Sequence, residues 1–595
     1  MIDKKSLNFW YKKKDLISWY KKPKKIISKV QNYYHWFPDG KTNVYFNCIK
    51  KNILKGLGNK IALITIDENW SENKITYRDL DNYVQKFAFI INKKSKNSNQ
   101  IMIHGSASIE TSISMFSCAK LGITHTVIFE ELQSEAILKR IKLLKPQMII
   151  TRTKNKKILD FFKKNSKKYN YKIIHFQKLK LDKYTFNLNI NDIIRLKCSH
   201  TSGKEILSNH HLFNLFTSGS TGEPKGIIHS SAGYLIYSKF SCQKKFGMKK
   251  NSIIFCVSDA GWINGHTYSL YGPLSIGATS IIIEKPISIL NVKKFLKVLK
   301  TYKVTILYLP VTLIRMLKSI DPNIKFRSKN LKTLGSMGEP LASSIAKWYA
   351  NSFVKKNNPI VNTYFQTETG GIIFSPEFND KLKNKTYGTV GKSISGYLKL
   401  NVKIKQKLIE LKIKTIWPGC MINVINGKKI WEKYWDKNGY FNLFDIGKLN
   451  KNHCLVINGR SDDVINIRGH RIGSEEIESI ILKIKNVSEV SAVSIKDKIE
   501  GHKIVIFSSI NSKNFFEIEK KINDELYKNF GSYALPKKIF FLSSLPKTRS
   551  GKIMRRILRD LLENPNKKIN NISTILNKKI IFEIKKEIVK DGKRR

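Results

Sequence analysis

A loop rich in hydroxyls and glycines at residues 216–226 constrains this chain more than any other segment. It reads Phe-Thr-Ser-Gly-Ser-Thr-Gly-Glu-Pro-Lys-Gly and follows the apolar segment Leu212–Phe216. Glycines let backbone N–H groups approach an anion closely, hydroxyls add donors, and Lys225 adds a mobile positive charge. The segment predicts a phosphate-binding loop; an ordinary Ser/Gly-rich surface turn is the alternative for this segment alone. It is not a P-loop, because Gly226 follows the lysine where a P-loop has serine or threonine.

Short apolar runs alternate with helix-length patterns along most of the chain. The alternation runs from Gln100 to Ile150 and resumes with Ile253–Val257, Thr279–Ile283 and Val304–Leu309, which are typical of buried strands. Such alternation predicts a layered α/β fold. Because 595 residues exceed what one hydrophobic core can organise, two or more domains are expected.

The domain boundary is expected at the polar passage Gly459–Asp463. Residues 1–461 are predicted to form a large N-terminal unit of α/β subdomains, and residues 462–595 a small, mobile C-terminal α/β unit. The lysine-rich, weakly periodic stretch 152–208 is interpreted as a variable surface excursion of the large unit.

Three local patterns predict helices. Lys74–Ile90 is expected to pass from a strand into an amphipathic helix, and Pro340 to open a helix that runs to about Ala350. Ser474 is expected to cap a helix in the small unit, with acidic residues in its first turn. The apolar face of that helix comprises Ile477, Ile480, Ile481 and Ile484.

The net charge of +63 raises the question of a nucleic-acid or membrane partner. The lysines are spread over the whole length beside abundant Ile and Asn, which also have A/T-rich codons, so genome composition explains the excess and neither partner is expected. The polar start Met1–Asp15 predicts no secretory signal, and no apolar run approaches the roughly 18 residues of a membrane span. Seven widely spaced cysteines without a CxxC pattern fit buried thiols in the cytoplasm.

Five further segments concentrate polar residues: Ser258–His266, Gly335–Pro340, Asn362–Gly371, Asp462–Arg471 and Pro546–Lys552. Together with the phosphate loop, and in this order, they resemble the motifs of the acyl-CoA synthetases of the adenylate-forming superfamily. The resemblance is strongest to the acetyl-CoA synthetases, with the propionyl-CoA synthetases next. It covers about residues 36–562, nearly the whole chain.

The resemblance implies a ligase that works in two steps. Acetate and ATP, with Mg²⁺, give acetyl-AMP and pyrophosphate, and the thiol of coenzyme A then displaces AMP. Because the first step joins two anions, a cation must meet them, and Lys552 is the implied catalytic residue. Asp462 resembles the hinge on which the small unit rotates between the two steps. The lysine that matches Lys552 in similar enzymes is a target of regulatory acylation. The resemblance therefore implies a lysine acetyltransferase and a deacetylase as partners.

The resemblance also assigns residues to the nucleotide. Glu368 is the implied magnesium ligand, since a hard cation beside phosphates prefers carboxylate oxygen. Asp445 is expected to accept from the ribose hydroxyls; a structural salt bridge is the alternative for each charged residue. The residues expected at ATP and AMP are Thr217, Ser218, Gly219, Ser220, Thr221, Gly222, Lys225, Gly338, Glu339, Pro340, Asn362, Thr363, Tyr364, Phe365, Gln366, Thr367, Asp445, Arg460 and Arg471.

Four residues are implied to line the acyl pocket: Ile263, Asn264, Met337 and Phe365. In acetate enzymes a tryptophan stands at the position of Phe365, so the smaller side chain here implies a deeper pocket. Valines stand at the positions of Ile263 and Met337 and a threonine at that of Asn264, so the larger side chains here imply a narrower pocket. Because these changes oppose each other, acetate is expected and propionate is the alternative.

The residues implied to contact coenzyme A are Lys154, Lys157, Asn264, Arg468 and Gly469. Phe129-Glu-Glu-Leu132 replaces a usual Phe-Gly-Gly-Phe, and a solvated lysine cluster is the alternative for residues 154–157. Two other functions therefore stay open. One is an adenylating enzyme that passes the acyl group to an acceptor other than coenzyme A. The other is an eroded scaffold that only binds anions or nucleic acid.

Overall fold

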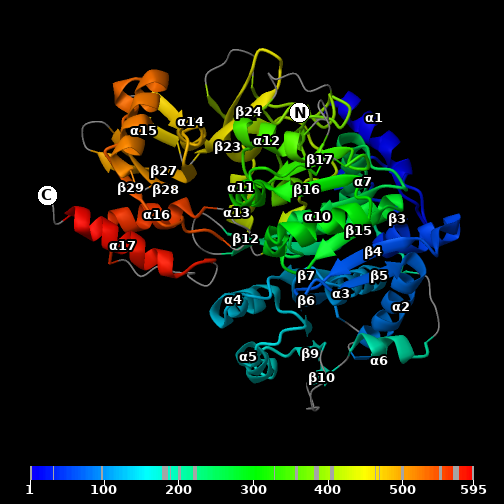
Figure 1. Ribbon diagram of the computed structural model, residues 1–595. Coiled ribbons are helices and arrows are strands. Elements are labelled where there is room, and N and C mark those ends of the chain that lie inside the picture. Colours follow the sequence, from blue (N-terminus) through cyan, green and yellow to red (C-terminus); the bar gives the residue numbers. More distant parts are fainter. Residues whose placement is uncertain are drawn as a thin grey trace.

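The computed structural model of the chain is shown in Figure 1. The residues that it describes are 3–30, 33–94, 98–176, 185–187, 189–198, 203–218, 224–326, 328–354, 360–380, 387–402, 408–425, 427–461, 464–467, 470–497, 501–512, 514–548, 553–566 and 575–592.

A seven-stranded sheet forms the centre of the large unit. Its strand order is β18-β17-β16-β14-β15-β4-β5, and all neighbours are parallel except β4 and β5. The strands β14, β15 and β16 confirm the three strands predicted from apolar runs, to within two residues. Their bounds are β4 Ile61–Ile66, β5 Glu72–Thr76, β14 Ile253–Cys256, β15 Thr279–Ile283, β16 Ile306–Pro310, β17 Thr333–Met337 and β18 Ile360–Asn362.

Three helices pack on this sheet through a continuous apolar core: α10 (Val292–Thr301), α11 (Val311–Ile320) and α12 (Ser343–Phe353). The helix expected from Pro340 is α12, but it begins at Ser343, so the predicted start is wrong by three residues. The chain needs the intervening turn because Leu341 is drawn into the core, where 2% of it is exposed.

An eight-stranded sheet forms the second layer, in the order β10-β9-β8-β6-β7-β12-β13-β22. The apolar segment Leu212–Phe216 lies inside β12, and β12 and β13 are antiparallel neighbours joined through residues 219–223, which lie outside the described residues. The bounds are β6 Gln100–His104, β7 Thr124–Ile128, β8 Met148–Thr151, β9 Lys172–His175, β10 Thr185–Asn187, β12 His211–Ser218, β13 Pro224–Ser230 and β22 Asn423–Val424.

Helices accompany this second sheet as an α/β alternation requires. The predicted strand-to-helix passage at Lys74–Ile90 is confirmed by β5 and α2 (Tyr77–Lys94). Within 152–208, α5 (Lys156–Ser166) and β9 pack Phe162 and Ile173 into the core, so this part of the stretch is integral to the sheet and is not only a surface excursion. The other helices here are α3 Ile109–Leu121, α4 Ser134–Leu144, α6 Ile190–Arg195 and α7 Ala232–Phe246.

A three-stranded sheet, β21-β23-β24, follows in the chain and leads toward the small unit. Its strands are β21 Ile409–Ile413, β23 Phe441–Leu449 and β24 Leu455–Arg460. Shorter elements of the large unit are α1 Lys4–Lys12, β1 Ile27–Val30, β2 Tyr33–Trp36, β3 Lys41–Thr42, β11 Ile206–Leu207, α8 Ile263–His266, α9 Gly272–Ile276, β19 Phe374–Ser375, β20 Lys392–Ser393 and α13 Lys428–Lys433.

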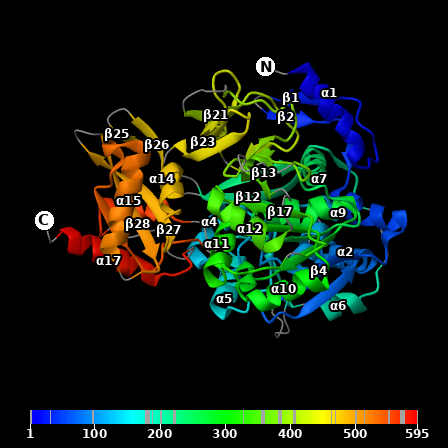
Figure 2. The ribbon, with the colours of Figure 1, turned by 45° about the horizontal axis from the view of Figure 1, so that its top comes forward.

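The small unit has its own sheet, its own helices and two apolar cores, and Figures 1 and 2 show it beside the large unit. This confirms the fold class, an α/β architecture with a large N-terminal and a small C-terminal part; the boundary at 461/462 stays a prediction. The elements are β25 Val464–Ile467, β26 His470–Gly473, β27 Val487–Asp497, β28 Gly501–Ile510, β29 Lys538–Phe541, α14 Ser474–Ile481, α15 Phe515–Phe530, α16 Arg555–Glu563 and α17 Lys579–Gly592.

The N-cap of α14 is Gly473 and not Ser474, so the predicted cap is wrong by one residue. A Cβ on Gly473 would lie 2.0 Å from the carbonyl oxygen of Asn458, so only glycine fits at this junction. The predicted apolar face is confirmed, since Ile477 and Ile481 are buried and the other two isoleucines pack against the same core.

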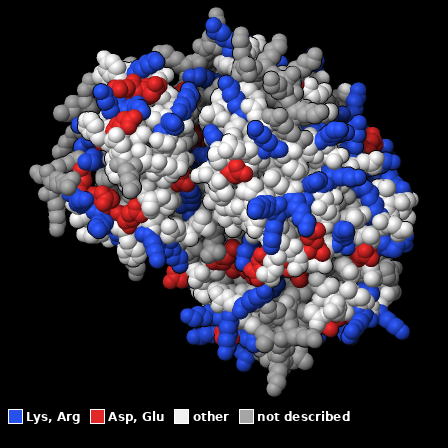
Figure 3. Space-filling view, viewed as in Figure 1, with Lys and Arg blue, Asp and Glu red and all other residues white. Residues whose placement is uncertain are grey.

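The distribution of charged side chains on the surface tests whether the high net charge forms a binding patch. Figure 3 shows Lys and Arg scattered over the visible face, with Asp and Glu between them, and not collected into one stripe. Among the described residues, no helix combines the length and apolarity that crossing a bilayer requires.

Candidate active site

Three of the predicted segments meet at one edge of the seven-stranded sheet. Residues 338–340 follow β17, residues 363–367 follow β18, and the segment with Ile263 and Asn264 follows β14. Because these strands are parallel, their carboxyl ends lie at the same edge, which is where open α/β sheets bind ligands. Gly338 turns the chain there with a φ of 89°, in the left-handed region that favours glycine.

Asn362 and Thr363 are fixed by buried hydrogen bonds to neighbouring strands. Ser336 Oγ donates to Asn362 Oδ1 at 3.0 Å, and Thr363 Oγ1 donates to the carbonyl of Ser336 at 2.7 Å. Asn362 Nδ2 donates to the carbonyl of Thr389 at 2.8 Å, and the hydroxyls of Tyr308 and Thr363 are 2.7 Å apart. These two residues therefore lock β17 and β18 together beneath the site.

Asp445 accepts hydrogen bonds from two other predicted nucleotide residues and so forms a second cluster. Its Oδ2 accepts from the Tyr364 hydroxyl at 2.6 Å and from Gln366 Nε2 at 2.6 Å, and 8% of the residue is exposed. Gln366 Nε2 also donates to the carbonyl of Leu443 at 2.6 Å. Asp445 in β23 lies opposite Arg460 in β24. Burial and the nearby Asp445 charge raise the pKa of Tyr364, so its hydroxyl stays a donor. The structure thus brings together four residues predicted at the nucleotide.

Glu368 lies in the short 3-10 turn Thr367–Thr369, and its carboxylate has a partner that the motifs did not indicate. Tyr434 donates its hydroxyl to Glu368 Oε1 at 2.6 Å. Lys225 Nζ lies 5.7 Å from the centre of the same tyrosine ring. Burial and the Glu368 charge raise the pKa of Tyr434, which keeps the hydroxyl protonated. Tyr434 therefore connects the lysine of the phosphate loop with the carboxylate expected at magnesium.

Three of the four residues predicted at the acyl pocket lie together. Asn264 Nδ2 contacts the sulfur of Met337, and Phe365 packs against the same cluster as Met337. The ring of Phe365 meets Tyr268 edge to face, with centroids 5.9 Å apart. Asn264 Oδ1 is buried without a partner among the described residues. Ile263 is buried in the adjoining core, against which Phe365 also packs.

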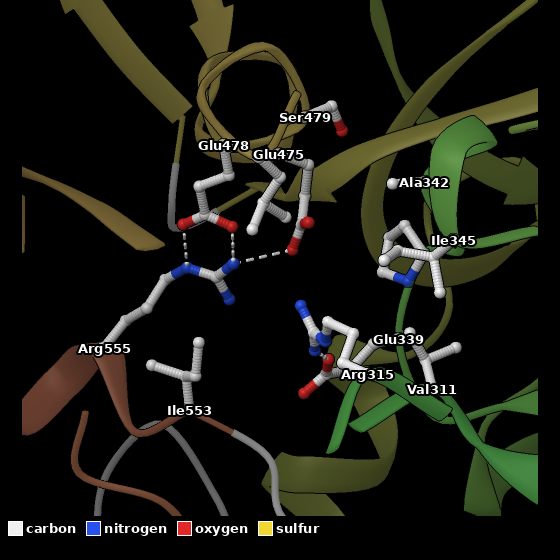
Figure 4. A pocket seen from close by; sticks show the side chains of 12 residues that line it. Val311, Arg315, Glu339, Ala342, Ile345, Glu475, Glu478, Ser479, Ile553 and Arg555 are labelled. Carbon is white, nitrogen blue, oxygen red and sulfur yellow. Dashed lines mark hydrogen bonds and ion pairs between the residues drawn. The ribbon is translucent and has the colours of Figure 1, made fainter. Parts of the chain in front are cut away.

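A pocket opens where the two units meet, and Figure 4 shows the side chains around it. The large unit contributes Glu339 and Pro340, both predicted at the nucleotide. The small unit contributes Ile553, the residue that follows Lys552 in the chain. The structure therefore brings the residue after the lysine-bearing motif to the segment expected at adenine and ribose.

Comparisons with known proteins identify the family. The model for "AMP-binding enzyme" matches residues 52–407, and the model for "AMP-binding enzyme C-terminal domain" matches residues 476–552. The chain belongs to the AMP-binding enzyme family. The model for "Acetyl-coenzyme A synthetase N-terminus" matches residues 3–48, so the resemblance inferred from the motifs is confirmed.

Similar proteins of known name span nearly the whole chain. The acetyl-coenzyme A synthetase of Leptospira biflexa is 33% identical over 92% of this chain and 88% of its own length. That of Herminiimonas arsenicoxydans is 31% identical over 94% and 90%. Among solved structures, the acetoacetyl-CoA synthetase from Streptomyces lividans superposes with a TM-score of 0.82 at 14% identity, over 99% of this chain and 92% of its own. An anthranilate CoA ligase in complex with anthranoyl-AMP gives 0.75 at 18% identity, over 87% and 97%.

In this AMP-binding enzyme, the two lysines expected at coenzyme A are surface residues. Lys154 forms an ion pair with Glu68 at 3.2 Å on the surface, and Lys157 is exposed at the start of α5. Their exposure fits the alternative of solvated lysines. Only Asn264 of the expected set that is described lies at the pocket.

The acidic segment that replaces glycines has a basic partner that the motifs did not reveal. Arg152 lies against Glu284, with hydrogen bonds of 2.7 and 2.8 Å, and against Glu110 at 3.4 Å. Glu130, in the departing segment, lies 4.0 Å from Arg152. Burial raises the pKa of Glu130 while the Arg152 charge lowers it. Arg152 therefore lies among three carboxylates, one of which belongs to the segment that replaces the glycines.

The phosphate loop and the lysine-bearing motif lie largely outside the described residues. Thr217 in β12 pairs in register with Lys225 in β13, which brackets the phosphate loop. The residues outside the described part of the chain are Gly219, Ser220, Thr221, Gly222, Asp462, Arg468, Gly469 and Lys552, together with the side chains of Ser218 and Arg471.

Proposed function

We propose that this chain is an AMP-forming acetate–CoA ligase. A carboxylate oxygen of acetate attacks the α-phosphorus of ATP, pyrophosphate leaves, and the thiol of coenzyme A then displaces AMP from acetyl-AMP. The observation that carries the proposal is the Asp445 cluster at the carboxyl ends of the parallel strands, in a chain of the AMP-binding enzyme family. Relatives named acetyl-coenzyme A synthetase over more than nine-tenths of the chain support acetate as the acid.

The nucleotide is held by groups that complement its charge. The ribose hydroxyls donate to Asp445, whose carboxylate is oriented by Tyr364 and Gln366. The phosphates lie on residues 217–222 and on Lys225, where glycines and hydroxyls provide donors. These groups hold ATP with its α-phosphate toward the acyl pocket.

Magnesium fits at Glu368. Glu368 would hold the ion as a single carboxylate ligand, which suits Mg²⁺, since this ion is usually bound by one or two carboxylates beside substrate phosphates. A bound ion would neutralise phosphate charge. Tyr434 orients the Glu368 carboxylate by donating to its Oε1.

Lys552 provides the positive charge that meets acetate and the α-phosphate in the first step. This role is supported by Ile553, which shares a pocket with Glu339 and Pro340. After pyrophosphate leaves, residues 462–595 rotate on Asp462, and Gly469 and Arg468 face the incoming coenzyme A. Acetylation of Lys552 by a lysine acetyltransferase removes the charge, and deacetylation restores it.

The test is a reaction with acetate, ATP, Mg²⁺ and coenzyme A, from which AMP, pyrophosphate and acetyl-CoA are expected in equal amounts. Formation of ADP and phosphate, or no turnover, would refute the proposal. Competition between acetate and propionate in one vessel measures the acid preference. Omitting coenzyme A should leave acetate-dependent ATP–pyrophosphate exchange, whereas failure to form the thioester after exchange would identify an acceptor other than coenzyme A.

A further inference from the structure

The pocket between the two units is lined by an alternating row of charges. Arg315 and Glu339 come from the large unit, and Glu475, Glu478 and Arg555 come from the small unit. Figure 4 shows the guanidinium of Arg315 between Glu339 and the carboxylate of Glu475. None of these residues except Glu339 belongs to the predicted nucleotide or acyl sites.

On the large-unit side, Arg315 binds the nucleotide segment, that is, residues Gly338–Pro340, which are expected at adenine and ribose. Its Nη2 donates to Glu339 Oε2, and the two side chains are 19% and 16% exposed. Arginine has five N–H donors in a planar fork, so one guanidinium can serve carboxylates on two sides. Burial lowers the pKa of Arg315, and the charges of Glu475 and Glu478 across the pocket oppose that effect.

On the small-unit side, the same two glutamates hold the segment that follows Lys552. Arg555 Nε donates to Glu478 Oε1 at 3.0 Å, and its Nη2 donates to Glu478 Oε2 at 2.5 Å and to Glu475 Oε1 at 2.8 Å. The Glu478 side chain is 6% exposed. The row therefore leads from Glu339 and Arg315 in the large unit to Glu475, Glu478 and Arg555 in the small unit, and Arg555 lies three positions after Lys552 in the chain.

The balance of charge makes Arg315 decisive for this contact. With all groups ionised, the row has three carboxylates and two guanidiniums. Without Arg315, three carboxylates would face one guanidinium in a poorly hydrated space, and the units would repel each other. Truncating one partner of a buried charge pair is strongly unfavourable, since the other charge stays desolvated.

We propose that Arg315 is a positioning residue that docks the small unit on the nucleotide segment for the first half-reaction. The inference rests on the proposed function, because it assumes that Lys552 must reach ATP. Docking by Arg315 is needed when the lysine faces the nucleotide, and it is released when the small unit rotates for thioester formation. Arg315 therefore acts on one step of the two.

The test separates the two half-reactions in the full chain. R315Q is expected to lower the rate of acetate-dependent ATP–pyrophosphate exchange by about 10- to 100-fold, the range of a typical coupling between sites. Thioester formation from supplied acetyl-AMP and coenzyme A should change less than about threefold. R315K should restore part of the exchange, because it keeps the charge but not the fork. The matched control is R78Q, since Arg78 is exposed on α2 and contacts Asn59.

Two further measurements distinguish docking from a direct effect on ATP. The dissociation constant of ATP without acetate should change less than about threefold in R315Q. In a double-mutant cycle, R315Q and E475Q should be non-additive in the exchange rate, because the two residues act across one interface. Equal loss of both half-reactions, or additive effects, would overturn the proposal. Wild-type protein without exchange would refute the proposed function instead; if R315Q does not fold, R315K and E475Q decide the question.

Discussion

Substituting Asp445 by asparagine tests the nucleotide site most directly. The change preserves shape, and one amide oxygen can still accept from both Tyr364 and Gln366, so the buried cluster should persist. The amide nitrogen would replace the second carboxylate oxygen. It cannot accept a hydrogen bond from a ribose hydroxyl, so the charged acceptor is lost while the fold is kept.

The magnitude follows from the kind of hydrogen bond that is removed. Asp445 is 8% exposed, and both its bonds of 2.6 Å have the short length of charge-assisted pairs. A hydrogen bond to a charged group contributes about 1.5–3 kcal/mol. Because about 1.4 kcal/mol corresponds to a factor of ten, the KM for ATP in D445N should rise about 10- to 140-fold.

The assay is acetate-dependent ATP–pyrophosphate exchange with ATP varied and acetate saturating. Y364F is the matched control, because it removes one donor to the carboxylate and leaves the Gln366 bond in place. Its KM for ATP should rise less than about tenfold. The reasoning fails if D445N keeps a KM for ATP within twofold of wild type, or if the KM for acetate rises equally.

Three other perturbations address the lysine, the acyl pocket and pH. K552A should lower the rate of pyrophosphate exchange by up to about a thousandfold, because a charge pair at about 4 Å contributes roughly 4 kcal/mol at a dielectric of 20. An equal loss of thioester formation from supplied acetyl-AMP would contradict this role. F365W should lower the propionate-to-acetate ratio of kcat/KM by about 10- to 200-fold, and an unchanged ratio would remove Phe365 from the pocket. Burial raises the pKa of Asp259 from 3.8 to about 7, so its contribution to stability is complete below pH 4 and is lost as pH rises through 7. D259N should therefore show a smaller fall in Tm between pH 5 and pH 8 than wild type, and an equal fall would be the contrary result.

Much of the local structure could be predicted from the sequence, because it depends on neighbours in the chain. The apolar runs at β14, β15 and β16 form strands, and Ile477 and Ile481 form the buried face of α14. Apart from the stretch 152–208, part of which packs into the second sheet, the errors lie at element ends. The start of α12 and the cap of α14 depend on Leu341 entering the core and on Asn458 approaching Gly473, and neither contact is written in a local pattern.

The local sequence was enough to indicate the chemistry, since hydroxyls, glycines and a lysine at 216–226 suit phosphate whatever surrounds them. Which side chains cooperate depends on the tertiary fold. Tyr364 reaches Asp445 across 81 positions, Tyr434 reaches Glu368 across 66, and the charge of Glu475 acts on Arg315 across the pocket between the two units. The physical reason is that a hydrogen bond or ion pair acts over a few ångströms. Which distant residues come that close depends on the order of the strands and on how the two units meet.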